Sequence, residues 1–239
     1  MNFEKFGMVM SDTSRSRAYL QLLIACNFFP SRVLILSPEG SNNNLLGNFS
    51  KSTNNESYKK FENFSFNPEF SVFQSLKSYK INFESINAKS VNEKNVIIKL
   101  KDFKEKFLVY SGFGGIILKK EVLSIDKKFI HVHGGFLPNY KGSTCNYYSI
   151  IKSNFIGAAS IIMNEKIDGG PVLITKKFKT PKNKLLIDHY YDPLIRAIVL
   201  LETIKNLLKN KIIRNSINNK EGDMYYVIHP VLKHISILK

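Results

Sequence analysis

The sequence has few cysteines, and their spacing limits the kinds of protein it can encode. Its 239 residues include only two, Cys26 and Cys145, which lie far apart and have no closely spaced partner. This arrangement argues against a disulfide framework and against a zinc site. We expect both thiols to be reduced. Cys145 is then either a small buried residue, which we favour, or a nucleophile.

The features of a membrane or secreted protein are also absent. No apolar stretch approaches the roughly 20 uninterrupted residues that a membrane-spanning helix needs. The first residues, MNFEKFGMVMSDTSRSR, contain an early acid and lack the basic segment and long apolar core of a secretory signal. We therefore expect no membrane partner and a cytoplasmic location.

Acidic residues are scarce relative to basic ones. The chain has 35 Lys and Arg against 19 Asp and Glu, which gives a formal net charge of +16. A concentrated basic face is typical of nucleic-acid binding, but here the lysines are dispersed along the whole chain. We expect attraction for anionic small molecules and no nucleic-acid partner. A basic binding module remains the non-enzymatic alternative.

The N-terminal part predicts a strand, a helix and a second strand. Residues 6–10 (FGMVM) and 32–36 (RVLIL) are apolar runs of strand length, and residues 15–27 carry apolar side chains at helical spacing. This order predicts a right-handed parallel unit. The connecting turn lacks the GxGxxG motif of dinucleotide sites. Its hydroxyls and Arg15 predict a phosphate site at the helix N-terminus, although helix capping alone also explains the hydroxyls.

The rest of the chain continues the alternation of strands and helices. We expect further strands at 107–110, 129–133, 158–163 and 172–178, helices at 69–79, 144–151 and 193–208, and a long loop or poorly ordered insertion at 40–68. The predicted fold class is α/β: a Rossmann-like, mostly parallel twisted sheet with helices on both faces. We expect a catalytic α/β domain at 1–180 and a small C-terminal helix and apolar tail at 181–239. The tail either docks on the core or forms a homodimer contact.

Two histidines end the predicted strand 129–133, just before a Gly-Gly turn. Residues at i and i+2 of a strand project to the same face, so His131 and His133 can converge on one spot. A lone histidine at a strand end is more often a satisfied core or surface residue. The i and i+2 spacing also permits half of a metal site, but no third ligand is evident. Similarly, Asp168 with its two glycines is by itself most simply a hairpin turn.

Three segments in a fixed order make a more specific pattern. They are FLVYSGFGGIILKKEVL, HVHGGFLPNYKG and ASIIMNEKIDGGPVL. Together they resemble the 10-formyltetrahydrofolate-dependent formyltransferase family, which includes glycinamide ribonucleotide, methionyl-tRNA and nucleotide-sugar formyltransferases. That family shows Asn-x-His at a strand end, then Leu-Pro-x-Tyr-x-Gly, then an Asp in a turn. Here His133, the segment 137–142 and Asp168 match, while His131 replaces the family asparagine.

The resemblance implies a role for each matched residue. The catalytic residues would be His133, Asp168 and His131, with the imidazoles stabilising an oxyanion and the carboxylate relaying the amine proton. Asp168 would raise the pKa of the histidine. The 10-formyltetrahydrofolate co-substrate would lie against Phe113, Gly114, Gly115, Ile116 and Ile117, closed by Glu165, Lys166 and Ile167. The acceptor would bind at Ser11, Thr13, Ser14, Arg15, Tyr140 and Lys141. No metal is implied.

The acceptor is less sharply indicated than the chemistry. Methionyl-tRNA formyltransferases carry a substantial further C-terminal domain, and about sixty residues follow the last core strand here, which disfavours tRNA. The insertion and the tail resemble those of the sugar enzymes. We therefore expect N-formylation of a nucleotide-linked amino sugar in surface-polysaccharide (O-antigen type) synthesis. Glycinamide ribonucleotide or another small amine, and a formyltetrahydrofolate hydrolase, remain alternatives.

Overall fold

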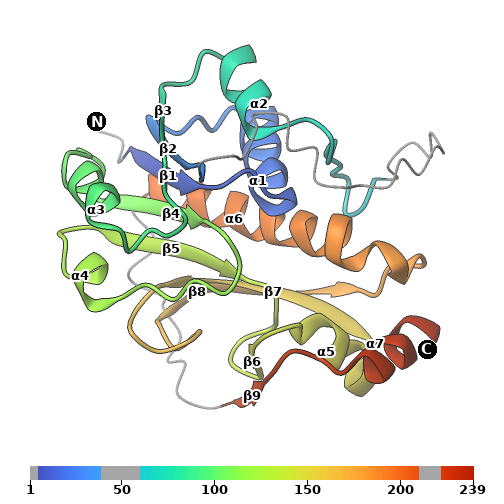
Figure 1. Cartoon of the computed structure of the whole chain (residues 1–239). Helices are drawn as coiled ribbons and strands as arrows, with labels where there is room; N and C mark the ends of the chain where they lie inside the picture. Colours follow the sequence, from blue (N-terminus) through green and yellow to red (C-terminus); the bar gives the residue numbers. More distant parts are fainter. Residues whose placement is uncertain (1–4, 39–59, 210–221) are drawn as a thin grey trace.

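The computed structural model describes residues 5–38, 60–209 and 222–239. Its main feature is a seven-stranded sheet with the order β3-β2-β1-β4-β5-β7-β8 (Figure 1). The strands are β1 Phe6–Met10, β2 Arg32–Leu36, β3 Phe83–Ile86, β4 Phe107–Ser111, β5 Lys128–His133, β7 Phe155–Ile162 and β8 Val172–Lys179. The first five are parallel, whereas β7 and β8 run antiparallel. The predicted mostly parallel sheet is confirmed, and β3 is an addition to it.

Helices cover both faces of this sheet, as predicted. On one face lie α1 (Ser14–Ala25), α2 (Val72–Ser78) and α6 (Asp192–Leu208); on the other lie α3 (Lys94–Lys101) and α4 (Lys120–Leu123). Alternating side chains of each strand supply the two cores. Met8 and Met10 pack in the core with α1 and α6, and Val9 packs in the core with α3. All three side chains are fully buried, because a parallel sheet is covered on both sides.

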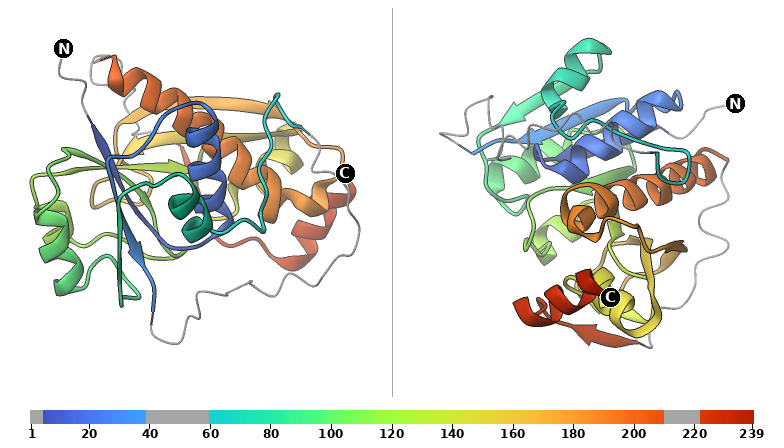
Figure 2. Two further views of the ribbon diagram at one scale, coloured as in Figure 1. Left: turned by 90° about the horizontal axis from the view of Figure 1, so that it is seen from above. Right: turned by 90° about the vertical axis from the view of Figure 1, so that its right-hand side faces the viewer.

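The C-terminal tail docks on the core. A second group of elements lies beside β7, made of β6 (Tyr140–Gly142), α5 (Cys145–Ser153), β9 (Asp223–Tyr225) and α7 (Pro230–Leu238) (Figures 1 and 2). Strand β9 pairs in parallel with β6, and α7 packs against α5. The tail thus brings residues from the end of the chain beside the turn that follows β5.

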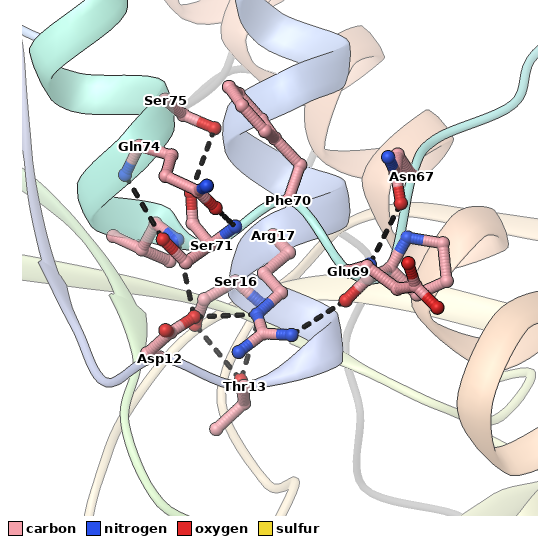
Figure 3. Close-up of polar contacts among 12 residues, drawn as sticks. Asp12, Thr13, Ser16, Arg17, Asn67, Glu69, Phe70, Ser71, Gln74 and Ser75 are labelled. Atoms are coloured by element: carbon pink, nitrogen blue, oxygen red, sulfur yellow. Dashed lines mark hydrogen bonds and ion pairs between the residues drawn. The ribbon is translucent and has the colours of Figure 1, made fainter. Parts of the chain in front are cut away.

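The segment before α2 differs from the prediction where the structure describes it. The helix expected at 69–79 begins at Val72, because Ser71 and Gln74 form a capping box that sets its start (Figure 3). Within the predicted loop 40–68, residues 60–68 pack on the core. Phe66 is buried and its ring stacks on that of Tyr190 at 5.1 Å. Residues 40–59 lie outside the described part of the chain.

Helix α6, which the predicted division assigns to the C-terminal part, packs against the sheet. It follows two short helical segments, Lys184–Leu186 and Ile187–Tyr191, and it contacts α1, β7 and β8. Its apolar residues belong to the same core as the strands of segment 1–180. The division of the chain at residue 180 stays a prediction. Among the described residues, no helix has the length and apolar character needed to cross a bilayer.

Candidate functional site

The end of β5 and the β7–β8 turn bring a histidine and a carboxylate together. Nδ1 of His133 lies 3.3 Å from Oδ2 of Asp168, and both side chains are largely buried, at 6% and 11% exposure. Asp168 adopts a left-handed backbone conformation, with φ of 47°, that this residue type tolerates in turns. The Gly142 N–H donates to the same carboxylate oxygen at 2.8 Å, which fixes its position. Two residues separated by 35 positions in the sequence therefore share one site.

Two adjoining cavities meet at this pair. The larger has a volume of about 720 Å³ and the smaller about 160 Å³. Both are bordered by His131, Asp168, Ile167 and the segment 115–117. His133 lines the larger one. Clefts of about 300 to 1,000 Å³ are typical of small-molecule sites, so the larger cavity alone can hold a sizeable ligand.

The ring of His133 faces hydrogen-bond acceptors on both of its nitrogens. Nε2 lies 2.8 Å from the Tyr140 carbonyl, to which its N–H donates, while Nδ1 faces Asp168. Burial lowers the pKa of His133 below 6.5, and the opposing effect of the Asp168 charge does not outweigh it. The expected direction of the Asp168 effect is present, but the expected net rise in pKa is wrong because desolvation dominates. A neutral ring leaves Nδ1 able to take a proton.

His131 lies on the border of both cavities. Burial, together with the charges of Arg15 and Arg196, holds its pKa well below 6.5, so its imidazole is neutral at physiological pH. Nδ1 lies 3.4 Å from the Tyr110 carbonyl. This is long for a hydrogen bond and does not fix the tautomer, so the ring can present an N–H to the cavity.

Cys145 lies in the wall of the larger cavity but is not a nucleophile. Its side chain is fully buried, and burial raises the pKa of the thiol to about 12. The sulfur is therefore protonated at neutral pH, in agreement with its prediction as a small buried residue. Within the described residues, no group of three or more His, Cys, Asp or Glu side chains has the arrangement of a metal site.

The structure brings nearly all of the predicted donor-site residues together. The smaller cavity is lined by Phe113, Gly114, Gly115, Ile116, Ile117, Lys166 and Ile167. Glu165 is exposed and is not part of this lining. It sits at the tip of the β7–β8 turn, where its side chain points to solvent while its neighbours close the cavity.

The hydroxyl-rich loop before α1 is only partly available to a ligand. The side chain of Ser11 is fully buried, so its predicted contact with the acceptor is wrong in this structure. The Thr13 Oγ1 caps α1 by accepting from the Ser16 N–H at 3.2 Å (Figure 3). Asp12 accepts from Arg17 at 2.6 Å and from the Val72 N–H, which ties the loop to α2.

Three residues of the same loop still border a cavity. Thr13, Ser14 and Arg15 line a third cavity of about 250 Å³, which shares Asp192 and Arg196 with the larger one. The Arg15 guanidinium donates to Ser111 Oγ at 3.1 Å and to the Gly112 carbonyl, both of which are neutral. Burial and the charge of Arg196 lower the pKa of Arg15, so a bound anion would relieve this arrangement.

The side chains of Tyr140 and Lys141 do not line the larger cavity. Both side chains are buried, and the Tyr140 ring packs against Phe155 and Tyr225 at centroid distances of 5.8 and 5.3 Å. Their predicted contact with the acceptor is therefore wrong for these side chains. Tyr140 instead contributes its backbone carbonyl to His133. The Leu-Pro-x-Tyr-x-Gly segment thus contacts the His133 and Asp168 pair through the main chain of Tyr140 and Gly142.

Sequence reasoning missed a polar cluster at the start of α6. Asp192 and Arg196 form an ion pair at 2.8 Å in the wall of the larger cavity, and Asn146 of α5 donates to Asp192 at 2.8 Å. The available signal was an acid and a base at i and i+4 in an otherwise apolar helical stretch. Such a pair is ordinary on a helix surface. Here both side chains are largely buried.

Comparisons with known proteins agree with this architecture. A family model described as Formyl transferase matches residues 48–186. The methionyl-tRNA formyltransferase of Finegoldia magna is 24% identical over 163 residues, covering 67% of this chain and 52% of that protein. The chain thus spans about half the length of the curated relatives it matches.

Solved structures share the fold at low sequence identity. A 4-N formyltransferase from Francisella tularensis aligns with a TM-score of 0.60 and 17% identity, covering 100% of this chain and 88% of that one. An N-formyltransferase from Helicobacter canadensis, solved with folinic acid and dTDP-3-aminofucose, aligns with a TM-score of 0.56 and 15% identity, covering 93% and 70%. Since the family model covers more than half of the sequence, the chain belongs to the formyl transferase family.

Proposed function

We propose that this protein transfers a formyl group from 10-formyltetrahydrofolate to the amine of a nucleotide-linked amino sugar. One observation carries the proposal. His133 and Asp168 lie 3.3 Å apart at the junction of two cavities, one of a size for a large acceptor and one lined by glycines and apolar side chains. The transfer of a group from one small molecule to another needs this arrangement, because donor and acceptor must both reach the His133 and Asp168 pair.

The smaller cavity suits the pterin end of a reduced folate, whose pyrimidine ring is flat. A Cβ added at Gly114 or Gly115 would meet no atom within 4 Å, so the backbone here borders open space that a planar ligand can approach. Phe113, Ile161 and Met163 supply apolar walls. We assign this cavity to the folate, which supplies an electrophilic formyl carbon when bound. The matched proteins with sugar substrates include one solved with folinic acid, which supports the assignment.

The resemblance led us to expect His133 to stabilise the oxyanion, but both of its ring nitrogens face protein acceptors, so we assign it with Asp168 to proton transfer instead. As the acceptor nitrogen forms its bond to the formyl carbon it loses a proton, and as the bond between that carbon and the folate nitrogen breaks, the folate nitrogen gains one. The proton taken from the acceptor can therefore be returned to the leaving folate. The neutral His133 ring donates from Nε2 to the Tyr140 carbonyl and keeps Nδ1 for an incoming proton. A proton held between Nδ1 and Asp168 would satisfy both groups, because an imidazolium has two N–H donors for its two acceptors.

His131 and Arg15 are assigned to the negative charge that develops on the formyl oxygen. The neutral His131 ring can offer an N–H at the border of both cavities, in place of the asparagine found in the family. Arg15 also lines the smaller cavity, and its guanidinium provides positive potential. Removing one such preorganised donor typically costs about 2.7 to 4 kcal/mol of transition-state stabilisation.

The larger cavity is assigned to the acceptor. Its walls combine Tyr225 and Tyr226 of the tail segment with polar groups near His133. The adjoining cavity at Thr13, Ser14 and Arg15 offers hydroxyls and a guanidinium to a phosphate group. The net charge of +16 would also favour the approach of an anionic acceptor.

Mass spectrometry of reaction mixtures tests the proposal. The purified protein is incubated with 10-formyltetrahydrofolate and a panel of nucleotide-linked amino sugars, and each product is examined for the mass of one added formyl group. We expect a gain with at least one member, formed at a much lower rate by the Asp168→Asn variant. Formate release without any acceptor would instead indicate a hydrolase. No formyl gain across a broad panel would contradict the sugar assignment.

Methionyl-tRNA is the second candidate acceptor. The relative from Finegoldia magna is a methionyl-tRNA formyltransferase, and the basic character of the chain is compatible with an RNA ligand. The same assay with charged initiator tRNA and with glycinamide ribonucleotide distinguishes these acceptors from the sugars. Transfer to tRNA with none to any nucleotide sugar would reverse our choice of acceptor.

A further inference from the structure

An ion pair at the start of α6 stands directly beside the two histidines. Nε of Arg196 lies 2.8 Å from Oδ2 of Asp192, one helical turn earlier, and the side chains are only 18% and 19% exposed. Both residues border the larger cavity together with His131 and His133. Buried ion pairs of this kind need further hydrogen bonds to be tolerated, and these are present.

Neighbouring elements hold the Asp192 carboxylate in place. Asn146 of α5 donates from Nδ2 to Oδ1 of Asp192 at 2.8 Å. The amide of Asn146 is itself fixed, because the Gly157 N–H of β7 donates to its Oδ1 at 2.7 Å. The carboxylate is therefore oriented through a chain of contacts that begins at the sheet.

Arg196 connects this arrangement to the histidine strand. Its Nη1 donates to the carbonyl of Val132, the residue between the two histidines, at 3.3 Å. On the other side of His133, a Cβ at Gly134 would collide with the side chains of both Arg196 and Asp192. The glycine thus lets the ion pair pack against the main chain on both sides of His133.

Several charged and polar groups face the two imidazoles. The neighbours of His133 are Asp168 of the β7–β8 turn, Asp192 and Arg196 of α6, the Tyr140 carbonyl of β6 and, nearby, the Cys145 thiol of α5. The neighbours of His131 are Arg15 of α1, Tyr110 of β4, Arg196 and His133. Burial is the main cause that lowers the pKa of either ring. The charge of Arg196 lowers it further in both, while Asp192 acts to raise that of His133.

We propose that Asp192 and Arg196 are a positioning pair, which fixes the strand end carrying His131 and His133 and sets the electrostatic field at their rings. The pair acts through the two histidines and not on the substrate. Its effect on catalysis therefore depends on the proposed formyl transfer. Its two members have opposite effects on the pKa of His133. Neutralising one member or the other should therefore move the His133 titration in opposite directions, whereas a general loosening of the fold would move it in the same direction in both variants.

Histidine titration by NMR tests this without any substrate. The ring C–H signals of the five histidines are followed against pH, and those of His131 and His133 are assigned with single His→Asn variants. Arg196→Gln should move both titration midpoints to higher pH, because a neighbouring positive charge is lost. Asp192→Asn should move the His133 midpoint to lower pH. Arg196→Lys, which keeps the charge, should lie closer to wild type than Arg196→Gln.

A second arginine–carboxylate pair provides the matched control. Arg32 bonds to Glu84 at the opposite end of the sheet, so Arg32→Gln and Glu84→Gln change the net charge equally but far from the site. They should leave both midpoints at their wild-type values. The proposal would be overturned if the His133 midpoint moved in the same direction in Arg196→Gln and Asp192→Asn. It would also be overturned if neither variant moved the midpoint more than the control variants do. Inactivity toward every acceptor with the expected shifts would contradict only the proposed function.

Discussion

At the scale of single residues, the neutral ring of His133 carries one N–H proton but faces two hydrogen-bond acceptors, the Tyr140 carbonyl and the Asp168 carboxylate. Its Nε2–H is used by the Tyr140 carbonyl, and its Nδ1 faces Asp168. In the proposed reaction this arrangement would let the His133 and Asp168 pair accept a proton, and the carboxylate would have two roles: it would orient the ring and share the proton. Replacing the carboxylate by an amide tests both at once.

Asp168→Asn should reduce formyl transfer by about 10²- to 10⁴-fold, the usual contribution of general acid–base catalysis. Folate binding should persist, because the smaller cavity keeps its glycine and apolar walls. The measurements are kcat/KM and folate affinity by calorimetry. Asp126→Asn is the control for the charge change, because this aspartate is exposed and lies just before β5, at the end of the strand away from His133. An activity within about threefold of wild type would contradict the role of Asp168.

His131 should make the stability of the fold depend on pH. Its pKa is well below 6.5 in the folded chain, mainly through burial and then through the Arg15 charge. Below about pH 6.5 the unfolded chain binds a proton that the folded chain does not, so stability falls as pH falls, by up to about 1.4 kcal/mol per pH unit for this group.

His131→Asn removes this titration and restores the family residue. The free energy of unfolding, measured by urea denaturation between pH 5 and 6.5, should therefore fall less steeply with decreasing pH than in wild type. His133 contributes in the same direction, so some slope should remain. Equal slopes for the variant and wild type would show that His131 protonates as readily in the folded chain as in the unfolded one.

Some site residues could be predicted from the sequence, and others could not, for physical reasons. His133 and Asp168 stand in short segments whose spacing is specific to the family, so they were predictable together. Asp192 and Arg196 have the spacing of an ordinary surface ion pair, and only packing places them in a cavity wall. Tyr140 lies in a predicted motif, yet its function depends on the direction of its carbonyl, which no sequence pattern reports.

At the scale of elements, the approach of α6 to the end of β5 depends on Gly134. Any side chain at this position would collide with Arg196 and Asp192. Gly134→Ala should therefore lower the free energy of unfolding by about 1 to 3 kcal/mol, as overpacking does. Gly114→Ala is the matched change, because its Cβ would meet nothing within 4 Å.

The comparison of these two variants by urea denaturation isolates the close contact. Gly114→Ala should change the free energy of unfolding by no more than about 1 kcal/mol. Equal losses in the two variants would indicate a general backbone effect of the missing glycine. In that case the ion pair would not be in direct contact with the strand end.

Elements with strong periodicity were predictable, and short ones were not. Strands β1, β2, β4 and β5 are apolar runs and were expected at nearly their observed bounds. Strand β3 was missed because its sequence, FESI, is short and only partly buried. The β6 and β9 pair was missed because its three-residue strands come together only after the tail has docked.

At the scale of the whole molecule, α7 presents apolar side chains to solvent. Val231, Ile235 and Leu238 are 59%, 48% and 71% exposed on one side of the helix, whereas Ser236 is buried against the protein. The homodimer contact expected of the tail stays a prediction, and this apolar face is where a twofold symmetric contact would form.

Light scattering after size-exclusion chromatography tests the dimer. Wild type should have twice the mass of one chain, and the double change Ile235→Glu with Leu238→Glu should have the mass of one. Ile98→Glu, at a similarly exposed isoleucine on α3, should not alter the mass. A monomeric wild type would refute this prediction and leave the site unaffected.

We propose that folate binds in the smaller cavity beside the His133 and Asp168 pair. A crystal structure with 5-formyltetrahydrofolate can show this binding mode, because this analogue does not donate its formyl group. We predict that the pterin ring lies against Gly114 to Ile117 and that the formyl end of the ligand faces Asp168. A ligand bound away from these residues, with the pair facing an empty cavity, would contradict the account.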